Sequence, residues 1–501
     1  MDVLSGLLQG FAVALQPMNL LWCLLGVVLG TVVGIMPGLG PPATIAMLLP
    51  LTFLMSPASA IIMLCGIYYG AKYGGSTTSI LLNVPGESAS VATCIDGYQM
   101  ARKGRAGAAL GIAAIASFIA GTFGVLGLML VAPPLAKMAL AFSSPEYFAL
   151  MALGLAMVVL LAGHSMVKAL LATLVGLWLA GIGTDLFSQT SRFTFGQMEL
   201  LAGIDFVVVA IGVFAIGEVL GNMEGREGTR ALPVPKGWRN VLPTRQDLKD
   251  SRFAFANGSI VGFLIGVLPG AGSTIASFIA YGVEKAVSRR PQEFGTGVVE
   301  GIAAPVAANN SETGGALVPM LTLAIPGSST TAVLLAALVL WGFKPGPIFI
   351  PENPAMFWGL VASMYIGNVM LLLLNMPLVP LFAQVLRAPL YVLYPVILGI
   401  SIVGVYSTGG SLFDLWLLAA FGLMGYLMRK LDYPSAPLIL GLVLGAPLER
   451  ALRQSLMMSD GSLAILVTRP VSAVMLSLAL LILLVPLFSK LNAMRLQALD
   501  K

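Results

Sequence analysis

The sequence predicts an all-α integral membrane protein with about 10–12 transmembrane segments, in which two inverted repeats contain re-entrant or broken helices. Of its 501 residues, 58% are hydrophobic and only 10% are charged, whereas a soluble domain carries about 25% charged residues. Apolar runs such as 106–131 and 471–488 are long enough to cross a bilayer, because a transmembrane helix takes about 20 apolar residues. These runs do not alternate apolar and polar residues as barrel strands do, which favours helices.

The glycines and prolines of two segments repeat with a fixed spacing. The pattern Gly26, Gly30, Gly34, Pro37, Gly38 and Gly40 recurs 232 residues later as Gly258, Gly262, Gly266, Pro269, Gly270 and Gly272. In a second pattern, two glycines precede an apolar stretch and a Pro-Gly pair, so that Pro85-Gly86 is matched by Pro326-Gly327 after 241 residues. Self-similarity of this kind predicts two structural repeats.

Hydropathy, charge and these repeats divide the chain into six segments. We expect an interfacial N-terminal helix at 1–17, transport repeat 1 at 18–105, connecting transmembrane helices at 106–221, a cytoplasmic polar loop at 222–252, transport repeat 2 at 253–350 and C-terminal transmembrane helices at 351–501. The basic run Arg102–Arg105 and the basic polar loop both belong in the cytoplasm by the positive-inside rule. Four apolar runs lie between them, so repeat 1 ends and repeat 2 begins on one side, which makes the repeats inverted.

The "PGLGPP" and "PGAGST" motifs break their helices, because proline stops a helix and glycine permits extended or left-handed backbone. A break inside the membrane exposes amides that attract an anion at the start of a half-helix, and carbonyls that hold a cation at the end of the preceding one. The alternative is a hinge that only packs or kinks. The candidates for substrate binding here are Gly38, Gly40, Gly270, Gly272 and Ser273.

The "NVPGESAS" and "AIPGSSTT" motifs place hydroxyl groups after a Pro-Gly turn. Hydroxyls and free amides at a helix start suit a carboxylate, although Ser and Thr are also good N-caps. The candidates here are Pro85, Gly86, Ser88, Pro326, Gly327, Ser328, Ser329 and Thr330, with Ser76 and Thr77 at the other foot of the first hairpin.

Charged and amide side chains within apolar regions supply the remaining candidates, because they are costly there unless they are paired or face a watery cavity. Lys72 can bind a substrate carboxylate or extend to an interface. The polar stretch Ala308–Gly315, with Asn310 as a further substrate candidate, is either a buried site or a loop between two spans. Asp96 is expected to cap a helix at the cytoplasmic surface, and Glu218 and Asp185 are expected at interfaces.

Enzymatic activity is not predicted. The chain has no Walker A motif, and one histidine and three cysteines give no cluster for a metal or haem. We expect no cofactor. The net charge of +5 fits basic cytoplasmic loops, so no nucleic-acid partner is expected.

Six segments, "GFKPGP" at 342–347 and five longer ones, together resemble the large membrane subunit of tripartite tricarboxylate transporters, the TctA family. The five longer segments are "GTVVGIMPGLGP", "YYGAKYGGSTTSILLNVPGE", "CIDGYQMARKGRAG", "GVLPGAGSTIASFIAYGVEK" and "GIAAPVAANNSETGGALVPMLTLAIPGSSTTAVLLAAL". The resemblance implies a multi-pass protein of the bacterial inner membrane that works with a small membrane subunit and a periplasmic solute-binding protein. It also implies import of citrate or other organic carboxylates, driven by an ion gradient that is typically Na⁺.

The expected mechanism follows from the resemblance and the motifs together. Substrate binds near the midplane and the two hairpin repeats move against a scaffold in an elevator-like step. The candidates for Na⁺ binding are Asn309, Asn310, Glu312 and Thr313. The alternatives are a carboxylate channel or facilitator, and a transporter for a different class of small anion.

Overall fold

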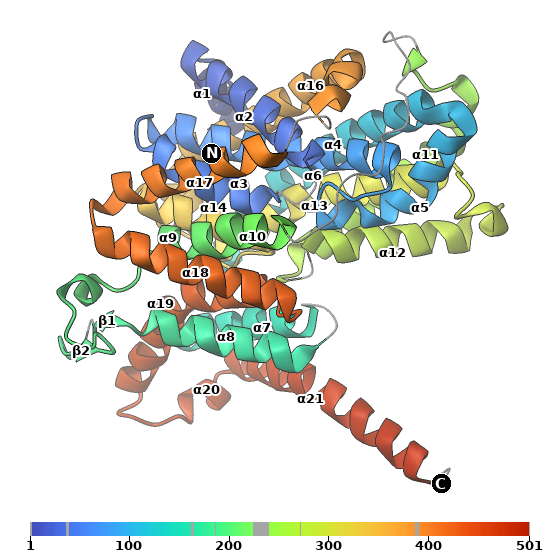
Figure 1. Ribbon diagram of the computed structural model, residues 1–501. Helices are drawn as coiled ribbons and strands as arrows, with labels where there is room; N and C mark the ends of the chain where they lie inside the picture. Colours follow the sequence, from blue (N-terminus) through green and yellow to red (C-terminus); the bar gives the residue numbers. More distant parts are fainter. Residues whose placement is uncertain are drawn as a thin grey trace. The chain divides into compact units, whose positions relative to one another are not determined.

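The computed structural model describes residues 3–36, 40–161, 165–185, 187–223, 240–270, 272–385 and 390–499 (Figure 1). Gly38 and part of the polar loop 222–252 lie outside the described residues. The chain divides into a larger unit, Met1–Ala136 with Val207–Lys430, and a smaller unit, Lys137–Phe206 with Leu431–Lys501. Within the described residues, six helices are long and apolar enough to span a membrane, and further apolar helices are shorter. The prediction of an all-α, multi-pass membrane protein is confirmed.

The first half of the larger unit begins with helices α1 (Val3–Ala14), α2 (Pro17–Ile35), α3 (Pro41–Thr52) and α4 (Pro57–Leu82). A 3-10 turn η1 (Ser88–Ser90), α5 (Val91–Met100), a π-helical turn η2 (Ala101–Arg105) and α6 (Ala106–Ala139) follow. Gly104 has a φ of 81° within η2, so the chain bends there between α5 and α6.

The second half of the larger unit contains the helices of the second repeat, α11 to α14, and further helices on either side of them. It comprises α9 (Phe206–Ala210), the π-helical turn η4 (Ile211–Ile216), α10 (Gly217–Met223), α11 (Arg245–Val267), α12 (Gly272–Val287), the 3-10 turn η6 (Pro291–Glu293), α13 (Glu300–Leu323), α14 (Ser329–Leu340), α15 (Phe349–Glu352), α16 (Pro354–Val385), α17 (Leu390–Gly409) and α18 (Leu412–Lys430).

Glycines allow α2 to pack directly on α4. A β-carbon added at three α2 glycines would collide with α4 carbonyl oxygens: Gly26 with Met63, Gly30 with Ile67 and Gly34 with Ala71. Residue numbers rise together along the two helices, so α2 and α4 run parallel. The intervening α3 must therefore run back, so that α2 and α3 form a helical hairpin.

The α11 and α13 helices repeat this packing. Their colliding pairs are Gly258 with Ala304, Gly262 with Ala308 and Gly266 with Glu312. The first members follow those of α2 by 232 residues and the second members follow those of α4 by 241 residues, which are the two spacings in the sequence. Helix α12 therefore corresponds to α3.

The helix tips that follow also match. Asn83 ends α4 with a φ of 56° and Ala324 ends α13 with a φ of 57°. A Pro-Gly pair comes next in each case. The Glu87 amide then donates to Ser90 Oγ at 3.4 Å, and the Ser328 amide, also 241 residues later, donates to Thr331 Oγ1 at 2.8 Å. The two segments thus share their backbone pattern as well as their glycines.

Two sets of contacts relate the repeats to each other. Tyr68 of α4 contacts Glu312 of α13. One turn later on α4, Lys72 pairs with the Glu87 carboxylate. That carboxylate also contacts Asn309, which lies one turn earlier on α13. The two helices therefore cross in opposite directions. Arg105, at the end of repeat 1, forms an ion pair with Asp247, at the start of α11 (2.6 Å). These contacts join the two repeats, and the inversion of the repeats across a bilayer stays a prediction.

A single glycine substitution tests the packing of α11 on α13. We expect Gly262→Leu to destabilise the protein by about 1–3 kcal/mol or more, because the new side chain meets backbone that cannot move aside. Gly282→Leu is the matched control, since a β-carbon there has no atom within 4 Å. Thermal unfolding of both variants in detergent checks the prediction, and equal melting temperatures would contradict it.

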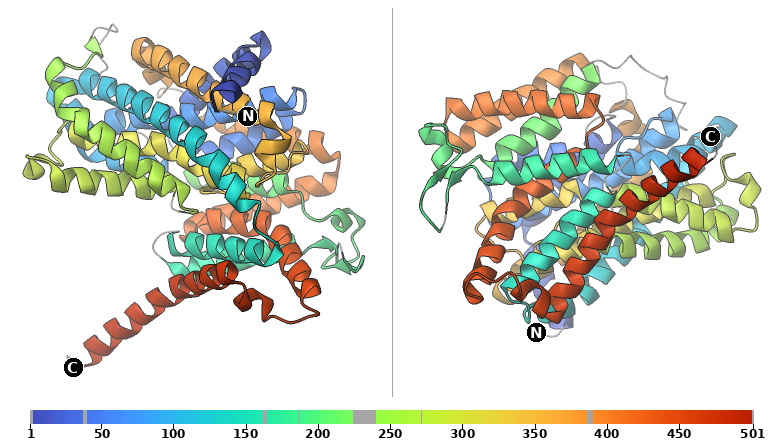
Figure 2. Two further views of the ribbon diagram at one scale, coloured as in Figure 1. Left: turned by 180° about the vertical axis from the view of Figure 1, so that it is seen from behind. Right: turned by 90° about the horizontal axis from the view of Figure 1, so that it is seen from below.

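The smaller unit contains α7 (Ser144–Leu161), α8 (Met166–Ala180), α19 (Ser435–Met458), α20 (Ile465–Thr468) and α21 (Pro470–Leu499). Helix α19 packs on α7 and α8, and α21 packs on α7; Figure 2 shows the ribbons of these helices from two further sides. A short hairpin of β1 (Gly183–Thr184) and β2 (Ser191–Arg192), followed by the 3-10 turn η3 (Met198–Ala202), comes after α8. The predicted segments 106–221 and 351–501 thus each contribute helices to both units.

Asp185 anchors this hairpin. Its carboxylate accepts hydrogen bonds from the amides of Phe187 and Ser188 at 2.7 and 3.1 Å and forms an ion pair with Arg453 at 2.9 Å. The two amides, and then Arg453 and Arg192, lower the pKa of Asp185 from its usual 3.8 to about 2. The side chain is 4% exposed, so Asp185 holds the turn from within.

The pH dependence of stability should report on Asp185. Because its pKa is lower in the folded state, its contribution to stability is present above pH 4 and is lost as pH falls toward 2. We expect the melting temperature of the protein to exceed that of Asp185→Asn at pH 6, and the difference to shrink below pH 4. Thermal unfolding between pH 6 and pH 3 checks this, and a difference independent of pH would contradict it.

Candidate functional site

The hairpin tips of the two repeats meet at a buried ion pair. Lys72 Nζ, on α4, lies 3.1 Å from Glu87 Oε2 and 2.8 Å from Ser273 Oγ at the start of α12. Asn309 Nδ2, on α13, donates to Glu87 Oε1 at 2.8 Å. Lys72 and Glu87 are 2% and 8% exposed, and Asn309 is 1% exposed. Both repeats therefore supply the surroundings of one ammonium group.

A second carboxylate lies beside this ion pair. Tyr68, one turn before Lys72, donates its hydroxyl to Glu312 Oε2 at 3.3 Å, and Lys72 Nζ lies 5.4 Å from the centre of the Tyr68 ring. Glu312 is fully buried. Two oxygens here, Glu312 Oε1 and Asn309 Oδ1, are buried without any hydrogen-bond partner. We call Tyr68, Lys72, Glu87, Asn309 and Glu312 the central cluster.

Hydroxyl groups lead from the surface to the central cluster. Thr274 Oγ1, on α12, donates to Ser88 Oγ, on η1, at 3.1 Å. Ser88 is exposed, Thr274 and Ser273 are half-buried, and Ser273 contacts Lys72. An anion that enters between η1 and α12 would meet hydroxyls before it reached the ammonium group.

The four hairpin tips differ in what their backbone amides contact. Gly270 donates its amide to the Gly327 carbonyl at 3.0 Å, so the two tips of repeat 2 are joined directly. Gly272 begins α12 with a φ of 65° and has nothing near the position of a β-carbon, which leaves this helix start accessible. The Gly40 amide, at the start of α3, instead donates to Glu218 Oε2 at 3.3 Å. Glu218, expected at an interface, therefore supplies a carboxyl acceptor to the start of α3 from α10.

The remaining tip residues have mainly structural contacts. Gly86 packs against the Gly34 carbonyl, and Pro326 and Gly327 are buried. Pro85 is half-buried. The Ser328 hydroxyl accepts from the Thr331 amide as the N-cap of α14, which agrees with the capping alternative; Ser329 is half-buried and Thr330 buried in the first turn of that helix.

The polar stretch 308–315 is part of the continuous helix α13, and its side chains diverge. Asn309 and Glu312 face the central cluster. Asn310 Nδ2 instead donates to Ser117 Oγ and to the Val306 carbonyl, both at 2.9 Å. The four residues expected to bind Na⁺ are thus divided between two places.

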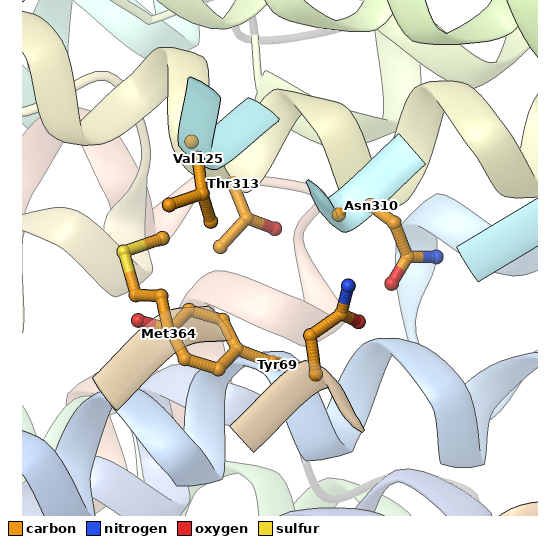
Figure 3. A pocket seen from close by; sticks show the side chains of 8 residues that line it. Tyr69, Val125, Asn310, Thr313 and Met364 are labelled. Atoms are coloured by element: carbon orange, nitrogen blue, oxygen red, sulfur yellow. The ribbon is translucent and has the colours of Figure 1, made fainter. Parts of the chain in front are cut away.

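Asn310 and Thr313 line a separate small cavity with Tyr69, Val125 and Met364 (Figure 3). Its volume is about 10 Å³, which is about one water molecule. The cavity is too small for a carboxylic acid substrate. Asn310, a candidate for substrate binding, lines this cavity and directs its amide to Ser117 and Val306.

Ser76 and Thr77 lie within α4 and not at a hairpin foot. Ser76 is one turn beyond Lys72 and donates its hydroxyl to the Lys72 carbonyl at 3.4 Å; Thr77 is buried. Two members of the central cluster were absent from the predicted candidates. Glu87 follows the Pro-Gly turn of the "NVPGESAS" motif, and Tyr68 lies four residues before Lys72 on the same helix face.

Asp96 caps backbone amides as expected, but it does so in the interior and not at the surface. It is fully buried, and its carboxylate accepts from the amides of Gly295, Gly297 and Val298 at 2.7–3.1 Å and from the Tyr281 hydroxyl at 2.9 Å. It therefore caps the loop before α13 and joins helix α5 of repeat 1 to repeat 2.

Comparison with known proteins identifies the family. The family model described as "Tripartite tricarboxylate transporter TctA family" matches residues 20–440. An "Uncharacterized 52.8 kDa protein in TAR-I ttuC' 3'region" of Agrobacterium vitis is 46% identical over 495 residues, which cover 99% of this chain and 98% of that protein. An "Uncharacterized protein in TAR-II ttuC' 3'region" of the same organism is 41% identical over 234 residues, which are 47% of this chain and 97% of that protein.

No solved structure matches the chain. Within the described residues, no three His, Cys, Asp or Glu side chains are grouped to hold a metal ion. The family is one of transporters and not of enzymes, and its systems are tripartite. The chain belongs to the tripartite tricarboxylate transporter TctA family.

Proposed function

We propose that this chain is the translocating subunit of a bacterial inner-membrane transporter that imports citrate or related organic carboxylates. It would work with a small membrane subunit and a periplasmic solute-binding protein, and an inward cation gradient, typically of Na⁺, would drive uptake. The observation that carries the proposal is the buried Lys72 ammonium, which lies where the tips of both repeats meet and next to a half-helix start.

Three groups would hold a substrate carboxylate. The Lys72 ammonium supplies the charge, and Ser273 Oγ, already 2.8 Å from it, supplies a hydroxyl. The free amides at the start of α12 add the positive end of a helix dipole. Ser88 and Thr274 would bind other polar groups of the substrate at the entrance.

The contacts between the repeats favour an elevator-like step. Lys72 with Ser273, Ser88 with Thr274, and Asp96 with the loop before α13 all join repeat 1 to repeat 2. Hairpins that are tied together at several points would move as one body with their bound substrate. A channel gains nothing from such ties, because its substrate path does not have to move.

Uptake by whole cells tests the proposed function. Cells without their own citrate uptake would express this chain with the small membrane subunit and the binding protein of the same transport system. We expect accumulation of labelled citrate or of another carboxylate from a panel, and loss of accumulation when the binding protein is omitted. Accumulation that does not need this chain, or no carboxylate uptake at all, would overturn the proposal.

A further inference from the structure

The two unpartnered oxygens of the central cluster indicate a ligand that this site is built to receive. Glu312 is 0% and Asn309 1% exposed, yet Glu312 Oε1 and Asn309 Oδ1 have no hydrogen-bond partner. No lysine or arginine in the described part of the chain forms an ion pair with Glu312. A buried carboxylate without a counter-charge is strongly unfavourable, so a cation or a proton must reach it.

The geometry favours a metal cation. Asn309 and Glu312 are three residues apart on α13, which places both side chains on one helix face. Their free atoms are a carbonyl oxygen and a carboxylate oxygen, and Glu87, whose Oε1 accepts from Asn309, brings a second carboxylate. Oxygen atoms of this kind are the ligands of hard cations, which bind several of them at once. A proton would need only one carboxylate oxygen, so it would not account for the second buried oxygen.

Glu87 also links this position to Lys72. Its two oxygens are divided between Asn309 Nδ2 at 2.8 Å and Lys72 Nζ at 3.1 Å. As long as Glu87 neutralises Lys72, the ammonium is not available to a substrate. Glu87 therefore occupies the place that a substrate carboxylate would take.

We propose that a sodium ion binds between Asn309 Oδ1 and Glu312 Oε1 and draws Glu87 away from Lys72, which frees the ammonium for a substrate carboxylate. The second half of this inference rests on the proposed function. One sodium ion and one carboxylate group together leave the charge of the buried cluster unchanged, while either alone changes it. Sodium and substrate should therefore strengthen each other's binding by about 5–150-fold, the usual range of such coupling.

Direct binding to the full-length chain in nanodiscs tests the inference, with ²²Na⁺ and labelled citrate as probes. We expect Glu312→Gln to weaken Na⁺ binding about tenfold or more, since it removes the charged ligand. Glu87→Gln should bind citrate without added Na⁺ at least as tightly as the unaltered chain does in saturating Na⁺. Glu293→Gln, which changes an exposed glutamate, is the control. If Glu312→Gln does not fold, Asn309→Ala should show the weakened Na⁺ binding.

The outcomes separate the two parts of the inference. Na⁺ binding that is equal in the unaltered chain, Glu312→Gln and Asn309→Ala would overturn the cation site, whatever carboxylate is bound. Citrate binding that depends on pH and not on Na⁺ would also overturn it and assign the site to a proton. Na⁺ binding that requires Glu312, in a chain that binds no carboxylate, would support the cation site and overturn the proposed substrate class. Citrate binding to Glu87→Gln that still needs Na⁺ would overturn the role of Glu87.

Discussion

Lys72→Met is expected to reduce carboxylate uptake by about 100-fold or more. Loss of a buried charged partner costs about 2–5 kcal/mol of binding free energy. Among the five residues of the central cluster, only Lys72 carries a positive charge. The measurement is the initial rate of citrate uptake, corrected for the amount of protein in the membrane. Lys285→Met, an exposed lysine of α12, should retain full uptake.

The Lys72 variant would also leave Glu87 buried without its counter-charge, which costs about 3–5 kcal/mol of stability. The double variant Lys72→Met with Glu87→Gln separates stability from transport. We expect it to recover most of the lost melting temperature and none of the lost uptake. Recovery of uptake in the double variant would show that Lys72 serves only to neutralise Glu87 and does not bind substrate.

Asp96→Ala is expected to cause the largest loss of stability of any single substitution considered. The change leaves the amides of Gly295, Gly297 and Val298 without their acceptor, and each buried group left unpaired costs about 1–3 kcal/mol. We expect little folded protein, and a partial recovery in Asp96→Asn, which keeps an acceptor. The yield of monodisperse protein and its melting temperature check the prediction.

Glu293→Ala, in the same loop, is the control for Asp96, because its side chain is exposed. An Asp96→Ala protein that is as stable as this control would contradict the assignment of Asp96 as a link between the repeats. If Asp96→Asn folds but transports slowly, the link also serves the movement of the hairpins.

The membrane class, the family and the repeated glycine pattern could be predicted from the sequence. Each depends only on the identity of residues and on their spacing along the chain. The glycines that pack against backbone have the same spacing in both repeats. Lys72 could be selected for a similar reason, since a lysine within an apolar run needs a special environment wherever the chain folds.

The partners of these residues could not be predicted. Ser273 is 201 residues from Lys72 and Asn309 is 222 residues from Glu87, and only the meeting of the two repeats brings them together. The separation of Asn309 and Glu312 from Asn310 has a local cause. In a continuous helix, neighbouring residues point about 100° apart, so a polar stretch read as one site is divided between two faces.

Glu218 shows the same limit at the start of α3. Its distance from Gly40 along the chain is 178 residues, and its position near the end of an apolar run suggested an interface. The contact means that one of the two glycine-rich tips has a carboxyl partner on another helix. The Gly270 amide of the other tip donates to the Gly327 carbonyl instead, so the two repeats differ in their tip contacts even though their backbones match.

We propose that the chain couples carboxylate import to a cation gradient. The most direct test of this coupling is uptake of labelled citrate into proteoliposomes that contain this chain and its small membrane partner, with the binding protein outside. We predict accumulation above the external concentration only when an inward Na⁺ gradient and the binding protein are both present. Equilibration without accumulation, or no uptake of citrate or any other carboxylate under any ion gradient, would contradict it.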